Sequence, residues 1–352
     1  MFKREISVTF LISFYIFSTQ LWGESAGAVA AYSHVIWFLE SFVISYFILS
    51  VFADFFTEKK WENLIVLVGT IAAVITLFLI LNPSLNEYVR SNVIIETLDT
   101  VSESEWSFRG FSVAESSAYS YGIVQGLVLA LCLFKVKDSP LYILPILLLF
   151  VSILFNARIG FVPAGFALAL ILFSGKIKLK SLVLLVLILF LGEWLLYDSA
   201  FSEQNESSLT WGLNFFSDTL NMVKGEDDGS NYTVLFNEML FFPETLIGFL
   251  FGEGKDLFGL RGGTDIGYIL QLFKGGIVYL LLLLCFLWFL FKRSYKYSEN
   301  KFIPILFFIT ILIVNIKGNA FFLSNGFFRL FISYYVYIIF SQRNINADDS
   351  IA

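Results

Sequence analysis

Charged residues are scarce in this sequence, at 15% of the total, whereas soluble domains carry about 25%. Proline is also scarce, with six residues, so few breaks interrupt the long apolar runs. The chain is 57% hydrophobic and contains 42 phenylalanines among its 352 residues. A globule of this size cannot bury so many aromatic side chains. The composition therefore excludes an ordinary soluble enzyme and predicts an integral membrane protein whose helix surfaces face lipid.

Cysteine and histidine are nearly absent, which limits metal and redox chemistry. Cys132 and Cys285 both lie inside apolar runs, which is typical of packing residues rather than of a disulfide or metal pair. With one histidine and no cysteine pair in a loop, the sequence shows no zinc site, and we expect neither metal nor cofactor. The net charge of −6 argues against a nucleic-acid partner.

Ten stretches are apolar and long enough to be considered membrane spans of about 20 residues. They are 6–22, 32–53, 62–82, 116–134, 140–156, 158–175, 181–197, 266–291, 302–317 and 319–340. More than half of the 23 basic residues fall in the two tails and in alternate short connections, which the positive-inside rule places in the cytoplasm. The expected fold is therefore an all-α polytopic bundle with both termini inside. The first 30 residues also resemble a signal peptide, but an uncleaved first span is the interpretation we follow.

Residues 1–352 are expected to form one membrane domain with two long outer loops, 83–115 and 198–265. The second loop has a helical apolar stripe that includes Leu209 and Leu213. A second helix is expected from the cap residue Asn231 to Phe242, and a third from Pro243 to the glycines of FGEG. Amphipathic helices here would lie on the membrane surface or cover a cavity.

Ionisable residues inside or beside spans are the candidate functional residues, because lipid makes them costly. Those expected deep in spans are Glu40, Lys274 and Arg329; those expected at the outer mouth are Arg109, Glu115, Arg158, Arg261 and Asp265. An arginine at a helix N-terminus favours an anion. The alternatives are a structural Glu40–Arg329 pair and snorkelling to lipid headgroups. His34 is more typical of a hydrogen-bonded packing residue than of a base.

Three segments resemble the bacterial O-antigen polymerase family (Wzy type), which is related to O-antigen ligases. They are FRGFSVAESSAYSYG at 108–122, NARIGFVPAGFALAL at 156–170, and LFGEGKDLFGLRGGTDIGYILQLFKGGIVYLL at 250–281. In the first, Arg109 and Gly110 are adjacent, a departure from the family's spacing. In the third, Asp265 stands where related ligases carry a histidine. The resemblance covers about a fifth of the chain.

The resemblance implies an enzyme of the bacterial inner membrane whose active site faces the periplasm. It would transfer a glycan from undecaprenyl pyrophosphate to a new lipid-linked repeat unit, and a chain-length regulator is a possible partner. Arg158, Arg261 and Arg109 would stabilise the leaving pyrophosphate, and Asp265 or Glu115 would act as base. The expected substrate-binding residues are Trp211, Phe215, Tyr232, Lys274 and Arg329. The alternatives are an O-antigen ligase and a flippase or transporter of lipid-linked sugars.

Overall fold

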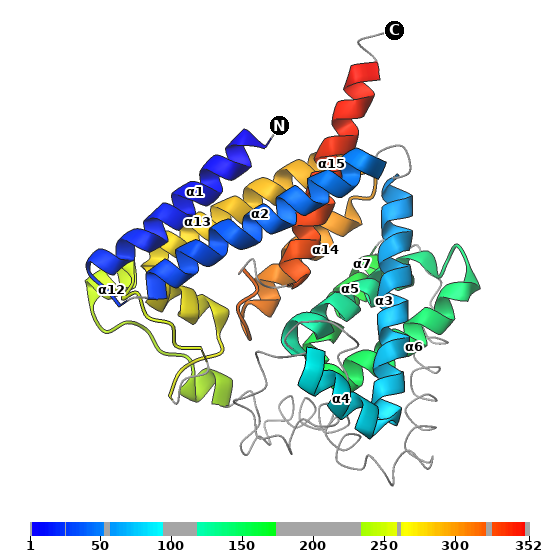
Figure 1. The fold of residues 1–352 in the computed structure, drawn as a ribbon, viewed down its shortest axis with the longest axis horizontal. Coiled ribbons are helices and arrows are strands. Elements are labelled where there is room, and N and C mark those ends of the chain that lie inside the picture. The colour runs from blue at the N-terminus through cyan, green and yellow to red at the C-terminus, as the bar shows by residue number, and fades with distance from the viewer. Residues whose placement is uncertain are drawn as a thin grey trace. The chain divides into compact units, whose positions relative to one another are not determined.

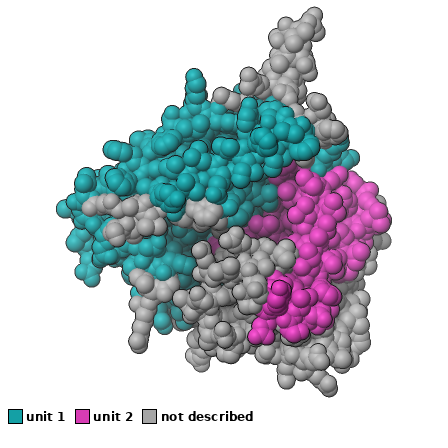
Figure 2. Space-filling model, in the orientation of Figure 1, with its two compact units in different colours: residues 1–60, 228–352 teal, residues 61–227 magenta. Residues whose placement is uncertain are grey.

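The computed structural model describes residues 2–24, 26–52, 57–93, 118–173, 234–258, 262–321 and 326–348, and every regular element within these ranges is a helix. By its internal contacts the chain divides into two compact units: residues 1–60 with 228–352, and residues 61–227 (Figure 2). The sequence predicted a single membrane domain.

Unit 1 is built from both ends of the chain. Its long helices are α1 (Lys3–Ser18), α2 (Ala26–Phe52), α13 (Gly267–Tyr297), α14 (Phe302–Val314) and α15 (Gly326–Asp348). Short elements complete it: η1 (Thr19–Leu21), the π-helical turn η5 (Val234–Glu238) and α12 (Leu246–Phe251). Helices α1, α2 and α13 lie side by side (Figure 1).

Helix α15 forms the core of unit 1. Phe331, Ile332, Tyr334 and Tyr335 are fully buried, although they cover several faces of the helix, as expected for a helix that is apolar all round and packed on all sides. Phe307 of α14 stacks against Phe331, with ring centroids 5.1 Å apart. The outer helices α1 and α2 instead expose large apolar side chains such as Phe14 and Phe47, a surface that suits lipid better than water.

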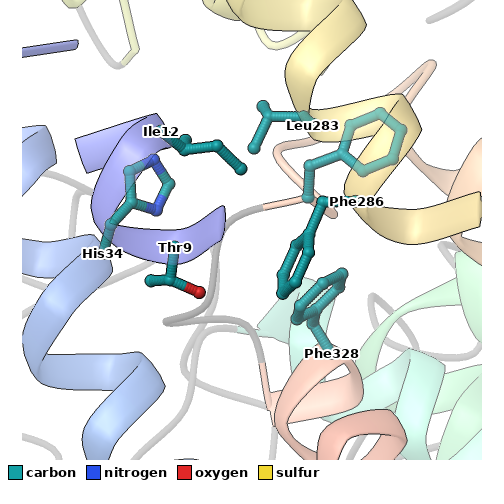
Figure 3. Close-up of a pocket in the computed structure, with 7 residues that line it drawn as sticks. Thr9, Ile12, His34, Leu283, Phe286 and Phe328 are labelled. Atoms are coloured by element: carbon teal, nitrogen blue, oxygen red, sulfur yellow. The ribbon is translucent and has the colours of Figure 1, made fainter. Parts of the chain in front are cut away.

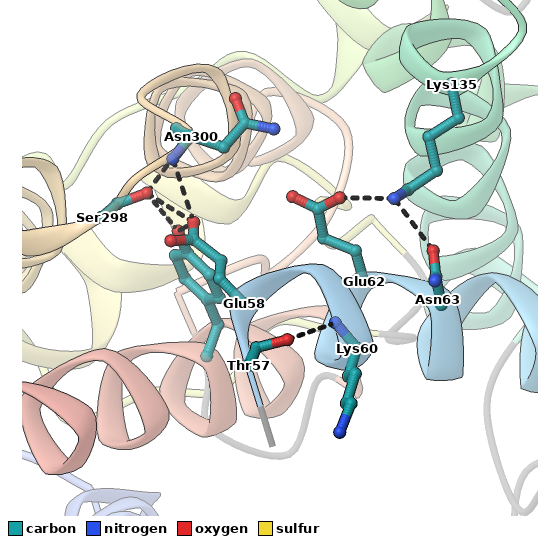
Figure 4. A network of polar contacts seen from close by, with 9 residues as sticks. Thr57, Glu58, Lys60, Glu62, Asn63, Lys135, Ser298 and Asn300 are labelled. Carbon is teal, nitrogen blue, oxygen red and sulfur yellow. Dashed lines mark hydrogen bonds and ion pairs between the residues drawn. The ribbon is translucent and has the colours of Figure 1, made fainter. Parts of the chain in front are cut away.

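A buried carboxylate fixes one end of unit 1, at the first residue of α3 (Glu58–Leu81). The Glu58 carboxylate accepts hydrogen bonds from the Ser298 hydroxyl at 2.7 Å and from the Asn300 N–H at 3.3 Å (Figure 4). It also accepts from the Tyr334 hydroxyl at 2.7 Å and from the Glu299 N–H at 2.6 Å. Thr57 caps the same helix by accepting from the Lys60 N–H at 3.3 Å. These charge-assisted bonds compensate for removing Glu58 from water.

The rest of α3 belongs to unit 2, together with α4 (Pro83–Val93), α5 (Ala118–Lys135), η3 (Pro140–Tyr142), α6 (Ile143–Asn156), η4 (Arg158–Gly160) and α7 (Phe161–Phe173). Helix α5 is the centre of unit 2. It approaches the η4–α7 segment so closely that a Cβ atom on Gly126 would lie 1.8 Å from the Gly160 carbonyl oxygen, so only glycine fits there. Lys135 pairs with Glu62 at 2.7 Å and donates to the Asn63 Oδ1 at 3.0 Å (Figure 4).

Among the described residues, three helices are long and apolar enough to cross a membrane: Ala30–Phe52, Glu58–Leu81 and Gly267–Tyr297. Shorter apolar helices occupy five more of the predicted ranges, from Tyr119–Lys135 to Gly326–Ser341. Helix α1 coincides with the first predicted range, and 181–197 lies outside the described residues. The structure is thus that of a helical membrane protein, while the number of spans stays a prediction.

Several predicted boundaries were wrong. The chain is not helical from Leu240 to Phe242, where a helix was expected. Pro243 cannot donate a backbone hydrogen bond and restricts its predecessor. Helix α12 begins only at Leu246, with Thr245 as its N-cap. Helix α4, which starts at Pro83 inside the predicted outer loop 83–115, was missed although proline at the first helical position was an available signal.

The last two predicted spans also needed correction. Helix α14 ends at Val314 because the Asn315 side chain accepts from the Ala320 N–H at 2.9 Å and so stabilises a turn instead of a further helical turn. Helix α15 therefore begins at Gly326, later than predicted. Arg329 accordingly lies in the first turn of α15 and not deep within a span.

Candidate functional site

The main irregularity of unit 1 is a break in α13 at Gly276, whose backbone angles are φ 70° and ψ −173°. This conformation is accessible essentially only to glycine. It divides the helix into residues 267–275 and residues 277–297. The apolar part after the break ends at Phe291, before Lys292 and Arg293. At about 1.5 Å per residue, residues 277–291 are roughly 22 Å long, which is short of a hydrocarbon core of about 30 Å. A helix that crosses the hydrocarbon core therefore also needs residues before the break.

The loop after α12 packs into this break. Helix α12 ends at Phe251, and its C-cap residue Gly252 has a φ of 83°. The next residue, Glu253, donates its backbone N–H to the Phe273 carbonyl at 2.8 Å. A Cβ atom on Gly276 would lie 2.3 Å from the Leu250 carbonyl oxygen. The break thus leaves the Phe273 carbonyl paired, as backbone groups must be in a low-dielectric setting.

The connection between α1 and α2 meets the same loop. The Trp22 indole N–H donates to the Gly252 carbonyl at 3.3 Å, and the Glu24 N–H donates to the Glu253 carbonyl at 2.9 Å. At the other end of α1, Glu5 pairs with Arg293 of α13. Helices α1 and α13 therefore run antiparallel. Residues 22–24 and 252–254 lie at one end of unit 1, and the basic residues near Arg293 lie at the other.

Lys274, one of the predicted substrate-binding residues, lies directly before the break. Its ammonium is 2.8 Å from the Asp256 carboxylate. The Lys274 side chain is only 7% exposed, whereas that of Asp256 is 48% exposed. A buried ammonium needs a partner of opposite charge, and here the partner comes from a loop that is half in solvent.

His34 of α2 is buried beside this segment and hydrogen-bonds through its Nε2 to the Tyr279 hydroxyl on α13. This is the hydrogen-bonded packing role that the sequence favoured. His34 also lines a cavity with Ile12, Leu283 and Phe286 (Figure 3). At about 10 Å³, the cavity has roughly the least volume that holds one water molecule, so it is too small for a sugar or a phosphate.

A network of amides lies one turn before Lys274. The Gln271 amide donates to the side-chain oxygens of Asn315 at 3.2 Å and Asn319 at 3.1 Å, and the Asn315 amide donates back to Gln271 at 3.3 Å. These bonds tie the first turns of α13 to the chain that follows α14. They fix the backbone at the end of unit 1 where α13 begins.

Asp265 lies just before α13 in this same region and is partly buried. Burial raises the pKa of its carboxyl above the usual value, and the nearby Lys317 ammonium opposes the increase. A carboxylate with a raised pKa is a better proton acceptor than an ordinary aspartate. The position and environment of Asp265 are thus compatible with the role of base that the resemblance implies.

Of the predicted site residues, Lys274 lies in the first part of α13 and Asp265 lies two residues before that helix begins. Arg329 and Glu40 form the alternative ion pair, at the long distance of 3.9 Å. Arg158 opens the turn η4 directly before α7, as predicted, but its side chain lies outside the description. The remaining candidates fall outside the described residues: Arg109, Glu115, Arg261, Trp211, Phe215 and Tyr232.

Three polar residues of this region were missed by the sequence analysis: Asp256, Gln271 and Asn315. Gln271 carried a usable signal, because it lies three residues before Lys274 and so on the same side of a helix. Asp256 and Asn315 carried none, since each becomes significant only through a partner distant in sequence. Within the described ranges, no three His, Cys, Asp or Glu side chains are grouped to hold a metal ion.

Of the two cysteines, Cys132 is buried in α5 as predicted, but Cys285 is exposed on α13 and so is not a packing residue within this chain. Both are free thiols. No protein-family model matches this chain, and no curated protein or solved structure matches it either.

Proposed function

We propose that this chain is a glycan polymerase of the bacterial inner membrane that acts on undecaprenyl-pyrophosphate-linked repeat units, as an O-antigen polymerase does. The observation that supports the proposal is the buried ammonium of Lys274 in the first part of α13, together with the partly buried Asp265 two residues before that helix begins. The substrate chemistry requires both kinds of group, because the leaving pyrophosphate needs a cation and the acceptor hydroxyl needs a base.

In the proposed reaction, the oxygen of the acceptor hydroxyl attacks the anomeric carbon of the growing glycan. A new glycosidic C–O bond forms, and the bond between that carbon and the phosphate oxygen breaks. The pyrophosphate leaves with the bonding electrons and is stabilised by Lys274. The resemblance implies the same role for Arg158, Arg261 and Arg109. The hydroxyl proton passes to Asp265. Because both substrates are held in the bilayer by their lipid tails, an almost entirely membrane-embedded protein suits the reaction.

The loop 198–265 is proposed to face the periplasm, with Trp211, Phe215 and Tyr232 binding sugars and with a surface for a chain-length regulator. The alternative of a transporter draws support from the broken helix, since discontinuous helices line the substrate sites of many transporters. The long predicted outer loop 198–265 and the charged residues predicted at the outer mouth favour the enzyme instead.

The test is a gel of surface polysaccharide from a strain that lacks the gene, with and without a plasmid-borne copy. A single repeat unit on the lipid A core, restored to a ladder by the plasmid, is the expected result. Bare core together with long polymer on its lipid carrier would instead indicate a ligase. A ladder unchanged by the deletion would contradict the proposal. The Asp265→Asn variant, present at native levels in the membrane, should not restore the ladder.

A further inference from the structure

The ion pair between Lys274 and Asp256 is unequal in its surroundings. Lys274 is on a helix and almost completely buried, whereas Asp256 is on a loop and is half exposed. Removing the ammonium from water is costly, so an anion must accompany it in the folded protein. The carboxylate has no such requirement, because about half of its side chain stays in solvent. Lys274 therefore needs an anion, but that anion need not be Asp256.

The loop that follows α12 is anchored by backbone hydrogen bonds before Asp256, and by fewer contacts at Asp256 itself. Its backbone is attached to Phe273 through the N–H groups of Glu253 at 2.8 Å and Lys255 at 3.4 Å. Gly254 has a φ of 66°. Beyond this point the described contacts of Asp256 are the bond to Lys274 and a 3.3 Å bond from the Phe258 N–H. The Asp256 side chain can thus leave while the attached part of the loop stays in place.

We propose that Lys274 belongs to a binding site for phosphate or diphosphate groups, and that Asp256 occupies this site as an internal substitute while no ligand is bound. A phosphate group offers more charge and more acceptor oxygens than a carboxylate, and lysine binds phosphate well as a point charge. A lipid-linked diphosphate would displace Asp256 from Lys274. The inference rests on the proposed function for the identity of the natural ligand, but not for the existence of the site.

The same loop provides a matched control. Glu253 pairs with Lys255 at 2.9 Å, and both side chains are partly exposed. Glu253→Gln and Asp256→Asn therefore remove one negative charge each, within three residues of one another, and break or weaken one ion pair each. Only Asp256→Asn removes the carboxylate that competes for Lys274. Any general effect of net charge on anion binding will appear in both variants.

The experiment measures binding of inorganic pyrophosphate to the full chain in phosphatidylcholine nanodiscs by titration calorimetry. Asp256→Asn should bind about fivefold tighter than the native protein, the effect of removing a competitor worth about 1 kcal/mol. Glu253→Gln should bind like the native protein, and Lys274→Met should bind at least tenfold more weakly. If the Lys274→Met chain does not fold, Lys274→Arg takes its place in the test: it keeps the positive charge and should retain pyrophosphate binding.

Equal affinity in Asp256→Asn and the native protein, an equal gain in Glu253→Gln, or undiminished binding in Lys274→Met would each overturn the proposal. Replacing part of the phosphatidylcholine with phosphatidylglycerol distinguishes the ligand's source. If a lipid headgroup fills the site, pyrophosphate affinity falls in the native protein, and if not, it stays constant. If the Lys274 site binds pyrophosphate as predicted but the deletion strain has a normal ladder, the site is supported and the polymerase function is contradicted. If the plasmid restores the ladder but Asp256→Asn does not bind pyrophosphate more tightly, the function is supported and the site is contradicted.

Discussion

The break in α13 leads to a quantitative prediction for Gly276→Ala. The alanine would have to adopt φ 70° and ψ −173°, and such a backbone costs a residue other than glycine about 1–3 kcal/mol. Its Cβ atom would also lie 2.3 Å from the Leu250 carbonyl oxygen and 2.5 Å from the Phe251 nitrogen. Relieving that overlap costs about 1–3 kcal/mol more. We therefore expect a loss of about 2–6 kcal/mol, concentrated where α12 meets α13.

The assay is amide hydrogen exchange of the purified protein, measured by mass spectrometry on peptides covering residues 246–258. Gly276→Ala should weaken the bond from the Glu253 N–H to the Phe273 carbonyl. A loss of about 2 kcal/mol corresponds to roughly thirtyfold faster exchange of that amide. The control is Gly165→Ala in α7, where an added Cβ atom meets nothing within 4 Å. That change should stabilise its helix by up to about 1 kcal/mol.

Unchanged exchange of residues 246–258 in Gly276→Ala would refute the reasoning, because it would mean that neither the glycine conformation nor the close approach is needed. Faster exchange across the whole chain in both variants would refute it as well, since the effect would then not be specific to the break.

Three further predictions follow from other parts of the chain. Glu58→Gln should lower the free energy of unfolding by about 2 kcal/mol, because an amide cannot accept all the bonds that the carboxylate accepts; an unchanged denaturation midpoint in detergent would contradict this. A thiol-specific spin label added in detergent should modify exposed Cys285 and spare buried Cys132. In a bilayer, the label on Cys285 should collide more often with oxygen, which dissolves in lipid, than with a water-soluble nickel chelate. The reverse preference would place this part of α13 outside the lipid. A carboxyl whose pKa is raised in the folded state contributes stability at low pH that is lost as the pH rises through the folded pKa. Asp265→Asn should therefore be more stable than the native chain at pH 7, and this advantage should disappear in acid; a less stable variant at pH 7 would show that the buried charge is well compensated.

The sequence predicted the class of fold and most helix positions because a membrane helix is specified by local composition. Long apolar runs bounded by basic residues locate membrane helices without any knowledge of tertiary contacts. The errors lie where side chains override that pattern. Pro243 and Thr245 delay a helix that apolar periodicity alone would begin earlier, and Asn315 ends α14 by bonding to the chain beyond it.

The candidate site was predictable in part for the same reason. Lys274 and Asp265 could be singled out because charge is unusual next to an apolar run. Asp256 could not, since it lies in a polar loop where an aspartate attracts no notice, and only folding brings it to Lys274. The break at Gly276 was also hidden. A glycine pair in an apolar run is compatible with an unbroken helix, and the left-handed conformation follows from the contact with α12.

The most direct test of the proposed polymerase uses substrate that the cell itself supplies. A strain that lacks the gene should accumulate lipid-linked repeat units, which can be extracted and mixed with the purified native protein in liposomes. We predict longer lipid-linked glycans together with released undecaprenyl pyrophosphate, and neither product with Asp265→Asn. Repeat units that stay single with the native protein, or that move across the bilayer without being joined, would contradict the proposed function.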